Sequence, residues 1–334
     1  MRKIFTVLSF LLFFGFTASA QQDAMFTKYM FNSLHYNPAY AGAKDHLAVG
    51  LLYRNQWWGI DGAPTSQTFT IHTPLKNERV GVGLSAYNDV IGPTQQMGAN
   101  LSYAYRIPMG ERGKLSIGLQ GGVTNWRADF TSLTLADNNP DEAFMELRPS
   151  LWLPNFGAGI YYYTKNFYIG ASVPQLIEYD LRDASTTTTE IWARNYRHYY
   201  AMMGAAIPIK GDGLVFKPSL LIKNVGLLSG LDKDEPFQAI GAPTEFDIDL
   251  SLLFYEALWV GVSFRSAFEA FNDTSSFDSV DLWASFYLKN GLRIGAAYDY
   301  TLTKLQRPAQ GSFELMVGYE FNYRSKQIVT PRYF

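Results

Sequence analysis

The chain has 334 residues and no cysteine, which excludes a thiol nucleophile, a disulfide scaffold, a cysteine-ligated zinc site and a lipoprotein anchor. Charged residues are also scarce, at 17% of the chain, whereas typical soluble domains have about 25%. The net charge of −2 lacks the excess of positive charge that is typical of nucleic-acid-binding proteins. After the N-terminus, no apolar run reaches the roughly 18 residues that a membrane-spanning helix needs. Aromatic residues, in contrast, make up 16% of the sequence.

The first twenty residues have the pattern of a cleavable signal peptide. Arg2 and Lys3 precede an apolar run over residues 4–16, and Ala18-Ser19-Ala20 fits the small-residue rule for cleavage after Ala20. A membrane helix is disfavoured because the run is too short to cross about 30 Å of hydrocarbon. We therefore expect an exported protein with a signal peptide (1–20), an N-terminal segment (21–45) and a body (46–334).

The body alternates between apolar and polar residues with a period of two, which indicates β-strands. In one segment, Val80, Val82 and Leu84 alternate with glycine and serine. The pattern predicts fourteen strands, at residues 46–57, 64–74, 79–89, 94–107, 114–127, 154–163, 166–174, 194–208, 213–224, 243–255, 257–265, 279–289, 291–301 and 312–323.

Two all-β architectures fit this alternation: a soluble sandwich with its apolar faces inside, and a transmembrane antiparallel β-barrel with these faces outside. The polar faces are rich in glycine and ionisable residues, as a crowded or wet lumen would be. An exported chain without a spanning helix can cross a bilayer only as a closed barrel. Aromatic residues near the predicted strand ends also suit the interfacial girdles of a barrel, namely Trp57, Trp58, Tyr87, Tyr103, Tyr105, Tyr161, Tyr298 and Tyr300.

The lengths of the links favour the barrel over the sandwich. Links after the even-numbered predicted strands are short and include Asn290-Gly291, a strong hairpin signal. Links after the fifth, seventh, ninth and eleventh strands are long, at residues 128–153, 175–193, 225–242 and 266–278. Short periplasmic turns and long external loops alternate in this way in outer-membrane barrels. We therefore predict a barrel of about fourteen strands, with residues 21–45 as a short helix or coil in the periplasmic mouth or the lumen.

Patterns of catalytic residues are absent from the sequence. The four histidines, His35, His46, His72 and His198, have no metal-ligand spacing, and no Gly-x-Ser-x-Gly motif occurs. We predict no catalytic, cofactor or metal site. The acidic stretches 137–142 and 232–235 lack the spacing of an EF-hand, so we interpret them as solvated loops rather than calcium sites.

Ionisable residues on the polar faces predict a charged lumen. Buried charges are normally paired, so we expect ion-pair networks that fix the lumen, although the same residues would line the pore of a porin. These residues are the carboxylates Asp247, Asp249, Asp281, Asp299, Glu314 and Glu320 and the arginines Arg54, Arg106, Arg265 and Arg293.

Several motifs resemble those of the PorP/SprF family, over nearly the whole mature chain. The two N-terminal blocks are the most specific in combination, while Ala24 and Phe313 replace a proline and a histidine that are frequent in the family. The motifs are Gln21-Gln22-Asp23, Tyr29-Met30-Phe31-Asn32, Asn37-Pro38-Ala39-Tyr40-Ala41-Gly42, residues 53–64, Thr68, His72-Thr73-Pro74-Leu75, Arg293-Ile294-Gly295, Tyr298-Asp299-Tyr300-Thr301, Gly311-Ser312-Phe313-Glu314 and Pro331-Arg332-Tyr333-Phe334.

The resemblance implies an outer-membrane barrel of Bacteroidota that works with the type IX secretion system. Family members assist the secretion or surface retention of large adhesins, and some serve gliding motility. The implied partners are an adhesin-type cargo, components of the secretion system and outer-membrane lipid. The resemblance carries over no enzymatic residues and no cofactor.

We interpret the motif residues as folding and docking elements rather than ligand sites. Asn37-Pro38 fixes a turn, and Gly42 lets the chain pass close to the barrel wall. Arg54 is expected to pair with Asp299 or Glu314 across the closing strands. Trp57 is expected at the external interface, before a tight loop from Gly59 to Pro64. The complete set is Asn37, Pro38, Tyr40, Gly42, Arg54, Asn55, Gln56, Trp57, Gly59, Pro64, Asp299 and Glu314.

Three functions remain open at this point. The leading hypothesis is a non-enzymatic outer-membrane barrel for secretion or anchoring of an adhesin, with the long external loops as its binding surface. The alternative is a channel or transporter for small or hydrophobic solutes, which would need an open lumen. An enzyme that acts on lipid is the third, and it would need a role for His72 or His198.

Overall fold

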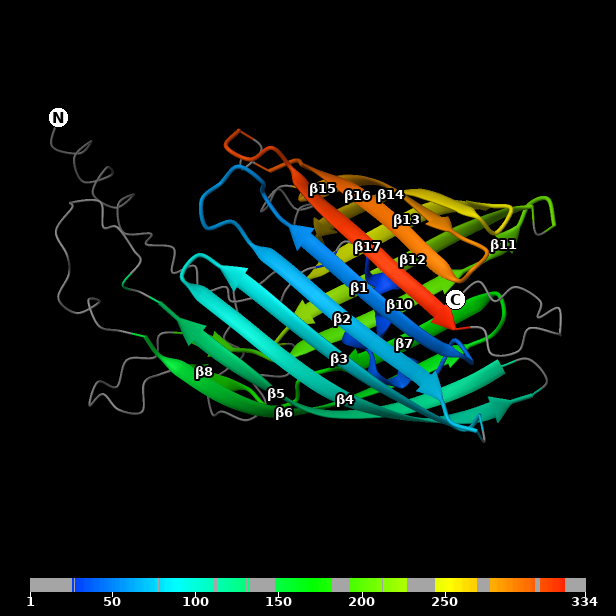
Figure 1. Ribbon diagram of the computed structural model, residues 1–334, viewed down its shortest axis with the longest axis horizontal. Coiled ribbons are helices and arrows are strands. Elements are labelled where there is room, and N and C mark those ends of the chain that lie inside the picture. The colour runs from blue at the N-terminus through cyan, green and yellow to red at the C-terminus, as the bar shows by residue number, and fades with distance from the viewer. Residues whose placement is uncertain are drawn as a thin grey trace, which may run out of the picture.

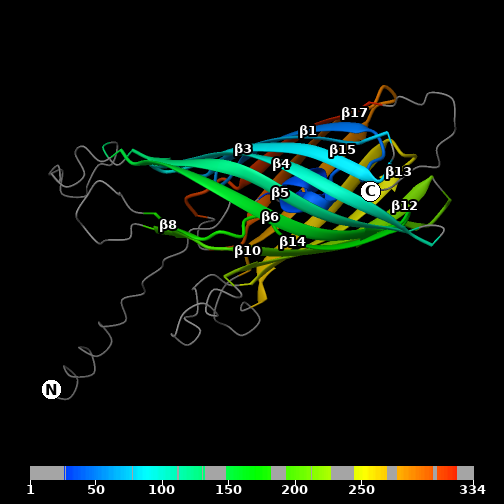
Figure 2. The same ribbon diagram turned by 90° about the horizontal axis from the view of Figure 1, so that it is seen from below.

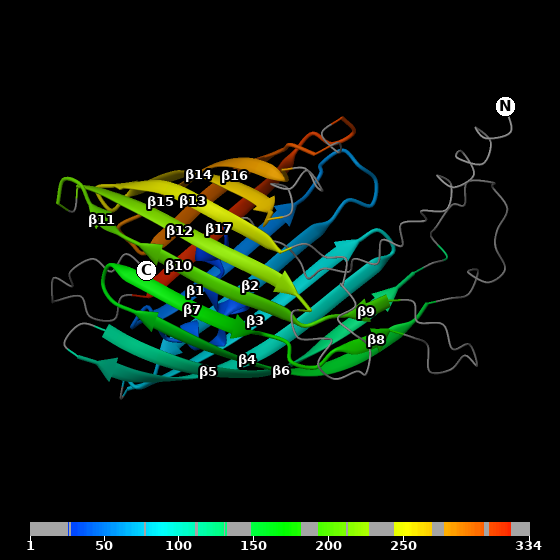
Figure 3. The same ribbon diagram turned by 180° about the vertical axis from the view of Figure 1, so that it is seen from behind.

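The computed structural model describes residues 26, 28–76, 78–110, 113–129, 131, 148–181, 193–211, 213–226, 244–268, 277–303 and 307–321. In this part of the chain, fourteen antiparallel strands close into a barrel (Figure 1, Figure 2 and Figure 3). They are β1 (Leu47–Asn55), β2 (Thr65–Pro74), β3 (Val80–Ile91), β4 (Thr94–Met109), β5 (Gly113–Ala128), β6 (Ser150–Tyr163), β7 (Phe167–Val173), β10 (His198–Ala205), β12 (Leu214–Val225), β13 (Glu245–Phe254), β14 (Leu258–Ala267), β15 (Ser279–Tyr287), β16 (Leu292–Thr301) and β17 (Ser312–Phe321).

The barrel closes through pairing of the first strand with the last, since β1 lies antiparallel to β17. The predicted single strand at 194–208 is divided in the structure, because short strands lie before and after β10. The pair β8 (Tyr179–Leu181) and β9 (Ala193–Asn195) forms a separate two-stranded sheet, and β11 (Ile207–Pro208) extends the pairing with β12.

Side chains alternate between the two faces of the wall as predicted. On β1, Leu51 is 51% exposed on the outside, whereas its neighbour Leu52 is 5% exposed inside the barrel. The outward face is apolar, and the inward face is polar. The predicted barrel class and strand number are therefore confirmed.

The two ends of the barrel differ in the length of their links. We call the end with short turns, such as the three residues 164–166 between β6 and β7, the periplasmic end. We call the opposite end, which carries the links 129–149, 174–197, 226–244 and 268–278, the outer end. The link between β3 and β4 is an exception, because it spans only Gly92-Pro93 at the outer end.

The N-terminal segment lies inside the barrel, where Figure 1 shows it in blue behind the wall. It contains three single-turn helices, η1 (Tyr29–Phe31), α2 (Ser33–Tyr36) and η2 (Pro38–Tyr40). The side chain of Asn37 starts η2, because its Oδ1 accepts a hydrogen bond of 2.9 Å from the backbone N–H of Ala39. No helix among the described residues is long and apolar enough to cross a membrane.

Two of the predicted girdle aromatics are placed wrongly by the sequence reasoning. Tyr87 and Tyr161 point into the lumen, where Tyr87 packs on His35 and Tyr161 packs on Tyr40. Both tyrosines occupy the inward phase of their strands, so they pack on the N-terminal segment instead of facing lipid. Other predicted girdle residues do point outward and are exposed, namely Trp58, Tyr103, Tyr105, Tyr298 and Tyr300.

Candidate functional site

The lumen is occupied by residues 28–45, which we call the plug. Most of its side chains are buried against the barrel, and the charged Lys28 is among them. The segment carries many aromatic and small residues, so it can fill the lumen closely. Phe31 illustrates this packing, because its ring contacts Trp259 and Trp283 at centroid distances of 5.1 and 5.6 Å and lies under the guanidinium of Arg293.

On one wall of the lumen, small residues of neighbouring strands lie directly opposite one another and form a row across the strands. Residues of β3 to β7 pair successively across it, in the order Gly81, Ala104, Gly118, Gly159 and Ser172. We call these five residues the small row. The missing side chains let the backbone of the plug from Asn37 to Gly42 lie directly against the wall.

At the glycines of the small row, close contact with the plug leaves no space for a methyl group. A Cβ atom on Gly118 would lie 2.5 Å from the carbonyl carbon of Pro38, and one on Gly81 would lie 2.6 Å from that of Ala41. At the end of the row, Ser172 Oγ donates a 2.7 Å hydrogen bond to the carbonyl oxygen of Tyr36. The wall and the plug are therefore complementary in shape along this row.

The opposite wall carries a second row in register, formed by charged and hydroxyl side chains. Its members on β13 to β17 are Asp249, Ser263, Asp281, Asp299 and Ser312. We call them the charged row. Buried carboxylates need a nearby cation, and the plug supplies one here.

Lys28 of the plug reaches into the charged row. Its ammonium Nζ lies 3.4 Å from Oδ2 of Asp281 and 3.9 Å from Oδ2 of Asp249, and it also donates to Ser263. The backbone N–H of Lys28 donates a 3.2 Å hydrogen bond to Oε2 of Glu314. The plug is therefore bound by charge on one wall and by shape on the other.

Arg54 is the second cation of this wall, and the predicted pairing is present. Its guanidinium Nη1 lies 2.7 Å from Oε1 of Glu314, and its Nη2 lies 2.9 Å from Oδ2 of Asp299. All three side chains are buried. Because Arg54 is on β1 and Glu314 is on β17, this ion pair crosses the seam at which the barrel closes. A third pair joins Arg265 to Asp247 through two hydrogen bonds.

The periplasmic end of the plug is fixed by polar contacts around Gly42. The N–H of Gly42 donates to Nδ1 of His72 over 3.2 Å, while its carbonyl oxygen accepts a 2.6 Å hydrogen bond from Arg106. Arg106 and Lys114 both pair with the carboxylate of Asp45. Gly42 has φ of 74°, the left-handed region in which glycine is favoured.

A second polar cluster lies beside this end. Lys44 and His46 both contact the carboxylate of Glu320 near the periplasmic end of β17. Burial opposes the charge on Lys44, but the carboxylate of Glu320 and the neighbouring Tyr40 together outweigh burial, so the pKa of Lys44 is raised. Lys44 therefore stays protonated and keeps the plug attached to the last strand.

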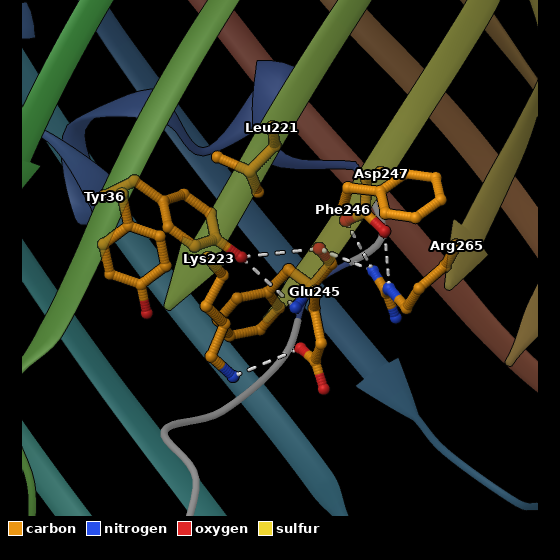
Figure 4. A pocket seen from close by; sticks show the side chains of 9 residues that line it. Tyr36, Leu221, Lys223, Glu245, Phe246, Asp247 and Arg265 are labelled. Carbon is orange, nitrogen blue, oxygen red and sulfur yellow. Dashed lines mark hydrogen bonds and ion pairs between the residues drawn. The ribbon is translucent and has the colours of Figure 1, made fainter. Parts of the chain in front are cut away.

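Two small cavities lie on opposite sides of the plug. The outer one has a volume of about 20 Å³ and is shown in Figure 4, where Lys223 faces Glu245 and Arg265 faces Asp247 beside Tyr36. The periplasmic one has a volume of about 30 Å³. Each has room for only one or two water molecules.

The predicted tight loop lies at the outer end of β1 and β2. Gly59 and Gly62 have φ of 98° and 74°, and the N–H of Gln56 donates to the carbonyl oxygen of Pro64 over 2.9 Å. The N–H of Trp57 donates to Ser312 Oγ, which joins this loop to the last strand. Asn55 is the last residue of β1 and faces Thr65 and Phe313 in register.

The remaining predicted site residues belong to the plug. Asn37 donates through Nδ2 to the carbonyl oxygen of Ile160 over 2.9 Å, which fixes the plug on β6. Pro38 and Tyr40 form η2, and the Tyr40 ring packs edge-on against His72 and Tyr161. The structure therefore brings the predicted residues together in two groups, one around the plug and the seam and one in the first outer loop.

Two of the histidines make hydrogen-bonding contacts within the barrel. His72 accepts a hydrogen bond from the plug, and Nδ1 of His198 contacts the carbonyl oxygen of Tyr196 over 2.9 Å. Among the described residues, no group of three or more His, Asp or Glu side chains is placed to hold a metal ion. The acidic stretches 137–142 and 232–235 lie outside the described residues.

Sequence reasoning placed Asp249, Asp281 and Asp299 on the lumen face, but it missed Lys28 and the register that aligns each row. Lys28 lies in a segment without strand periodicity, and its carboxylate partners are more than two hundred positions away in the chain. The rows depend on strand register, which alternation alone does not give. The glycine-rich polar faces were the available signal, and they predicted a crowded lumen without showing what fills it.

Comparison with solved structures gives other outer-membrane barrels. Omp33 of Acinetobacter baumannii is 10% identical with a TM-score of 0.46, and the match covers 83% of this chain and 98% of that one. The CymD monoaromatic hydrocarbon channel is 11% identical with a TM-score of 0.49 over 88% and 93% of the two chains. A FadL homologue of Pseudomonas aeruginosa is 14% identical with a TM-score of 0.44 over 87% and 94%. At these values none of them bears on what this barrel does.

The family comparison is more informative. No curated protein matches the sequence. Residues 18–319 match the family described as type IX secretion system membrane protein PorP/SprF, which covers nearly the whole chain. The match agrees with the closed barrel and with the motifs at the plug and the seam. The protein is an outer-membrane β-barrel, and it belongs to the PorP/SprF family of type IX secretion system membrane proteins.

Proposed function

We propose that this barrel is a non-enzymatic component that assists type IX secretion or surface anchoring of a large adhesin-type cargo. The observation that carries the proposal is the plug, because it fills the lumen and is bound by the small row and the charged row. Because the plug occupies the lumen, the outer end of the barrel is the surface available to bind a cargo protein, and the lumen does not serve as a channel. A role in gliding motility and contact with other components of the secretion system are parts of the same proposal.

The experiment compares proteins on the cell surface and in the medium between a gene deletion and the same strain complemented with the wild-type gene. We expect one or a few large adhesins to leave the surface of the deletion strain. Their appearance in the medium would indicate anchoring, whereas their retention inside the cell would indicate export. An unchanged set of exported proteins would refute the proposal.

The channel alternative has its own test. Purified wild-type barrel in a planar lipid bilayer should give no steady single-channel conductance, since the cavities beside the plug hold only a few water molecules. Stable conductance by the wild-type protein would favour the channel over the secretion role.

A further inference from the structure

Strand β6 continues far beyond its neighbour β7 at the outer end of the barrel. β6 has 14 residues and β7 has 7, and the ladder between them covers only Ala158–Tyr163 of β6. On its other side β6 pairs with β5 as far as Ser150. Figure 3 shows β6 in this region beside β8 and β9, which pair with each other and, among the described residues, with no other strand. The outer part of β6 is therefore a strand edge.

The phase of the ladder shows which backbone groups point away from β5. The N–H of Ala128 donates to the carbonyl oxygen of Pro149, so odd-numbered residues of this strand bond to β5. The backbone groups of Ser150, Trp152, Pro154 and Phe156 consequently point toward the edge.

The inner part of this edge is closed by the chain itself. The carbonyl oxygen of Phe156 accepts a 2.8 Å hydrogen bond from Leu176, and the side-chain amide of Asn155 bonds both to the N–H and to the carbonyl oxygen of Ile177. Pro154 has no N–H, and its carbonyl oxygen accepts from the hydroxyl of Tyr179. Natural sheets protect their edges with such devices.

The outer part of the edge has no strand partner within the described part of the chain. Within the described residues, no hydrogen bond reaches the backbone N–H and C=O groups of Ser150 and Trp152. The outward row Gln95, Arg127 and Ser150 is polar, so the edge lies beyond the apolar band and faces the aqueous outer side. Trp152 is 69% exposed one step below this row.

We propose that the β6 edge at Ser150 and Trp152 binds an extended segment of a partner protein, which adds a strand to the barrel wall. Only a strand can satisfy alternating backbone donors and acceptors at this spacing. The exposed guanidinium of Arg127 donates to the neutral amide oxygen of Gln95, so an acidic residue opposite Ser150 would complement its charge. An aromatic or aliphatic residue two positions away would cover Trp152. The partner is an extended segment of the exported cargo, and this identification rests on the proposed function.

Proline substitutions test the edge without breaking the barrel. Of the backbone groups, Ser150→Pro and Trp152→Pro remove only N–H groups that point away from β5, and Pro154 already occupies the same phase in the native strand. Ser150→Pro also removes the hydroxyl that accepts from Asn125, and Trp152→Pro also removes the ring. Trp152→Ala is the matched control, because it removes the ring and keeps the N–H. Mobility of unheated protein in SDS gels reports whether each variant is folded.

A defined probe makes the binding measurement independent of the cargo. The probe is the fluorescent peptide acetyl-Thr-Thr-Glu-Thr-Phe-Thr-Thr-amide, with an isomer N-methylated on Glu and Phe and another isomer N-methylated on the two Thr residues that directly follow Glu and Phe. Anisotropy with the full barrel in lipid nanodiscs should give clearly different affinities for the two isomers, because only one set of N–H groups faces β6. The double proline variant should bind the unmodified peptide roughly tenfold more weakly, from two lost hydrogen bonds.

The outcomes separate this proposal from the proposed function. Failure of the peptide to bind, or equal binding by both isomers and by the proline variant, would overturn the edge site whatever the barrel does in the cell. In cells, the double proline variant should lose the adhesins that the deletion strain loses, and full retention would overturn the cargo as partner. If the deletion loses no exported protein, the proposed function fails while the peptide result still decides the edge.

Discussion

Replacement of Gly118 by alanine tests whether the plug is held by contact with the barrel wall. The added Cβ would lie 2.5 Å from the carbonyl carbon of Pro38, whereas ordinary contacts are 3.4–4 Å. The plug backbone would have to retreat by about 1 Å, which strains well-packed atoms. Such a shift also weakens the hydrogen bonds that Asn37 and Ser172 make with their partners across this contact.

The expected loss of stability follows from these contacts. Overpacking of this kind costs typically about 1–3 kcal/mol, and each weakened hydrogen bond adds up to about 1 kcal/mol. We expect the free energy of unfolding to fall by roughly 2–4 kcal/mol on these grounds. Gly121→Ala is the matched control on the same strand, since its Cβ would meet Phe156 at an ordinary 3.5 Å.

Urea unfolding of the barrel in lipid vesicles measures the difference, and limited proteolysis reports whether the plug has become accessible. The Gly118 variant should also show intermittent conductance in a planar bilayer, because a displaced plug opens the lumen. If Gly118→Ala and Gly121→Ala have the same stability and the same protease resistance, the plug is not held by this wall.

Further predictions concern the charges. Arg54→Met leaves Asp299 and Glu314 buried without their cation, so the free energy of unfolding should fall by about 3–5 kcal/mol, and an unchanged urea midpoint would contradict the ion pair. Lys28→Met should release the plug and raise the single-channel conductance above that of wild type, whereas a silent variant would show that Lys28 is dispensable. Burial raises the pKa of Asp278 to about 6, so its contribution to stability is complete below the ordinary pKa near 3.8 and is lost as the pH rises through 6. In Asp278→Asn the urea midpoint of unfolding should therefore change less between about pH 4 and 7 than in wild type. An equally steep pH dependence in the variant would refute the raised pKa of Asp278.

The fold could be predicted from sequence because each barrel strand carries its own alternating signal. The outward face must be apolar over its full height, and turn residues mark the strand ends. The alternation failed to place a strand end where a proline fits either the start of a strand or its interior. The sequence predicts a strand start at Pro154, but β6 begins at Ser150, since the missing N–H of Pro154 points away from β5 and the ladder continues past it.

The contents of the lumen were harder to predict than its wall. Arg54 and Glu314 could be paired in advance, because both lie on inward phases of the strands that close the barrel. The sequence predicts Tyr87 and Tyr161 at the lipid interface although their strand phase is inward, because nothing local indicates an aromatic partner inside. That partner is the plug, whose position depends on contacts spread over the whole chain.

Closure of the barrel and docking of the plug are linked through shared groups. Glu314 on β17 accepts hydrogen bonds from both Arg54 on β1 and the backbone of Lys28 in the plug. The plug leads directly into β1, so the chain that fills the lumen also supplies one side of the seam. Removal of the plug would take from Glu314 the hydrogen bond of the Lys28 backbone and from Asp281 its ion pair with Lys28, while Arg54 would still bond to Glu314. The small row and the charged row then act as a template for the plug, and the family motifs lie at two different places: Asn37-Pro38 against the small row, and Arg54 at the seam.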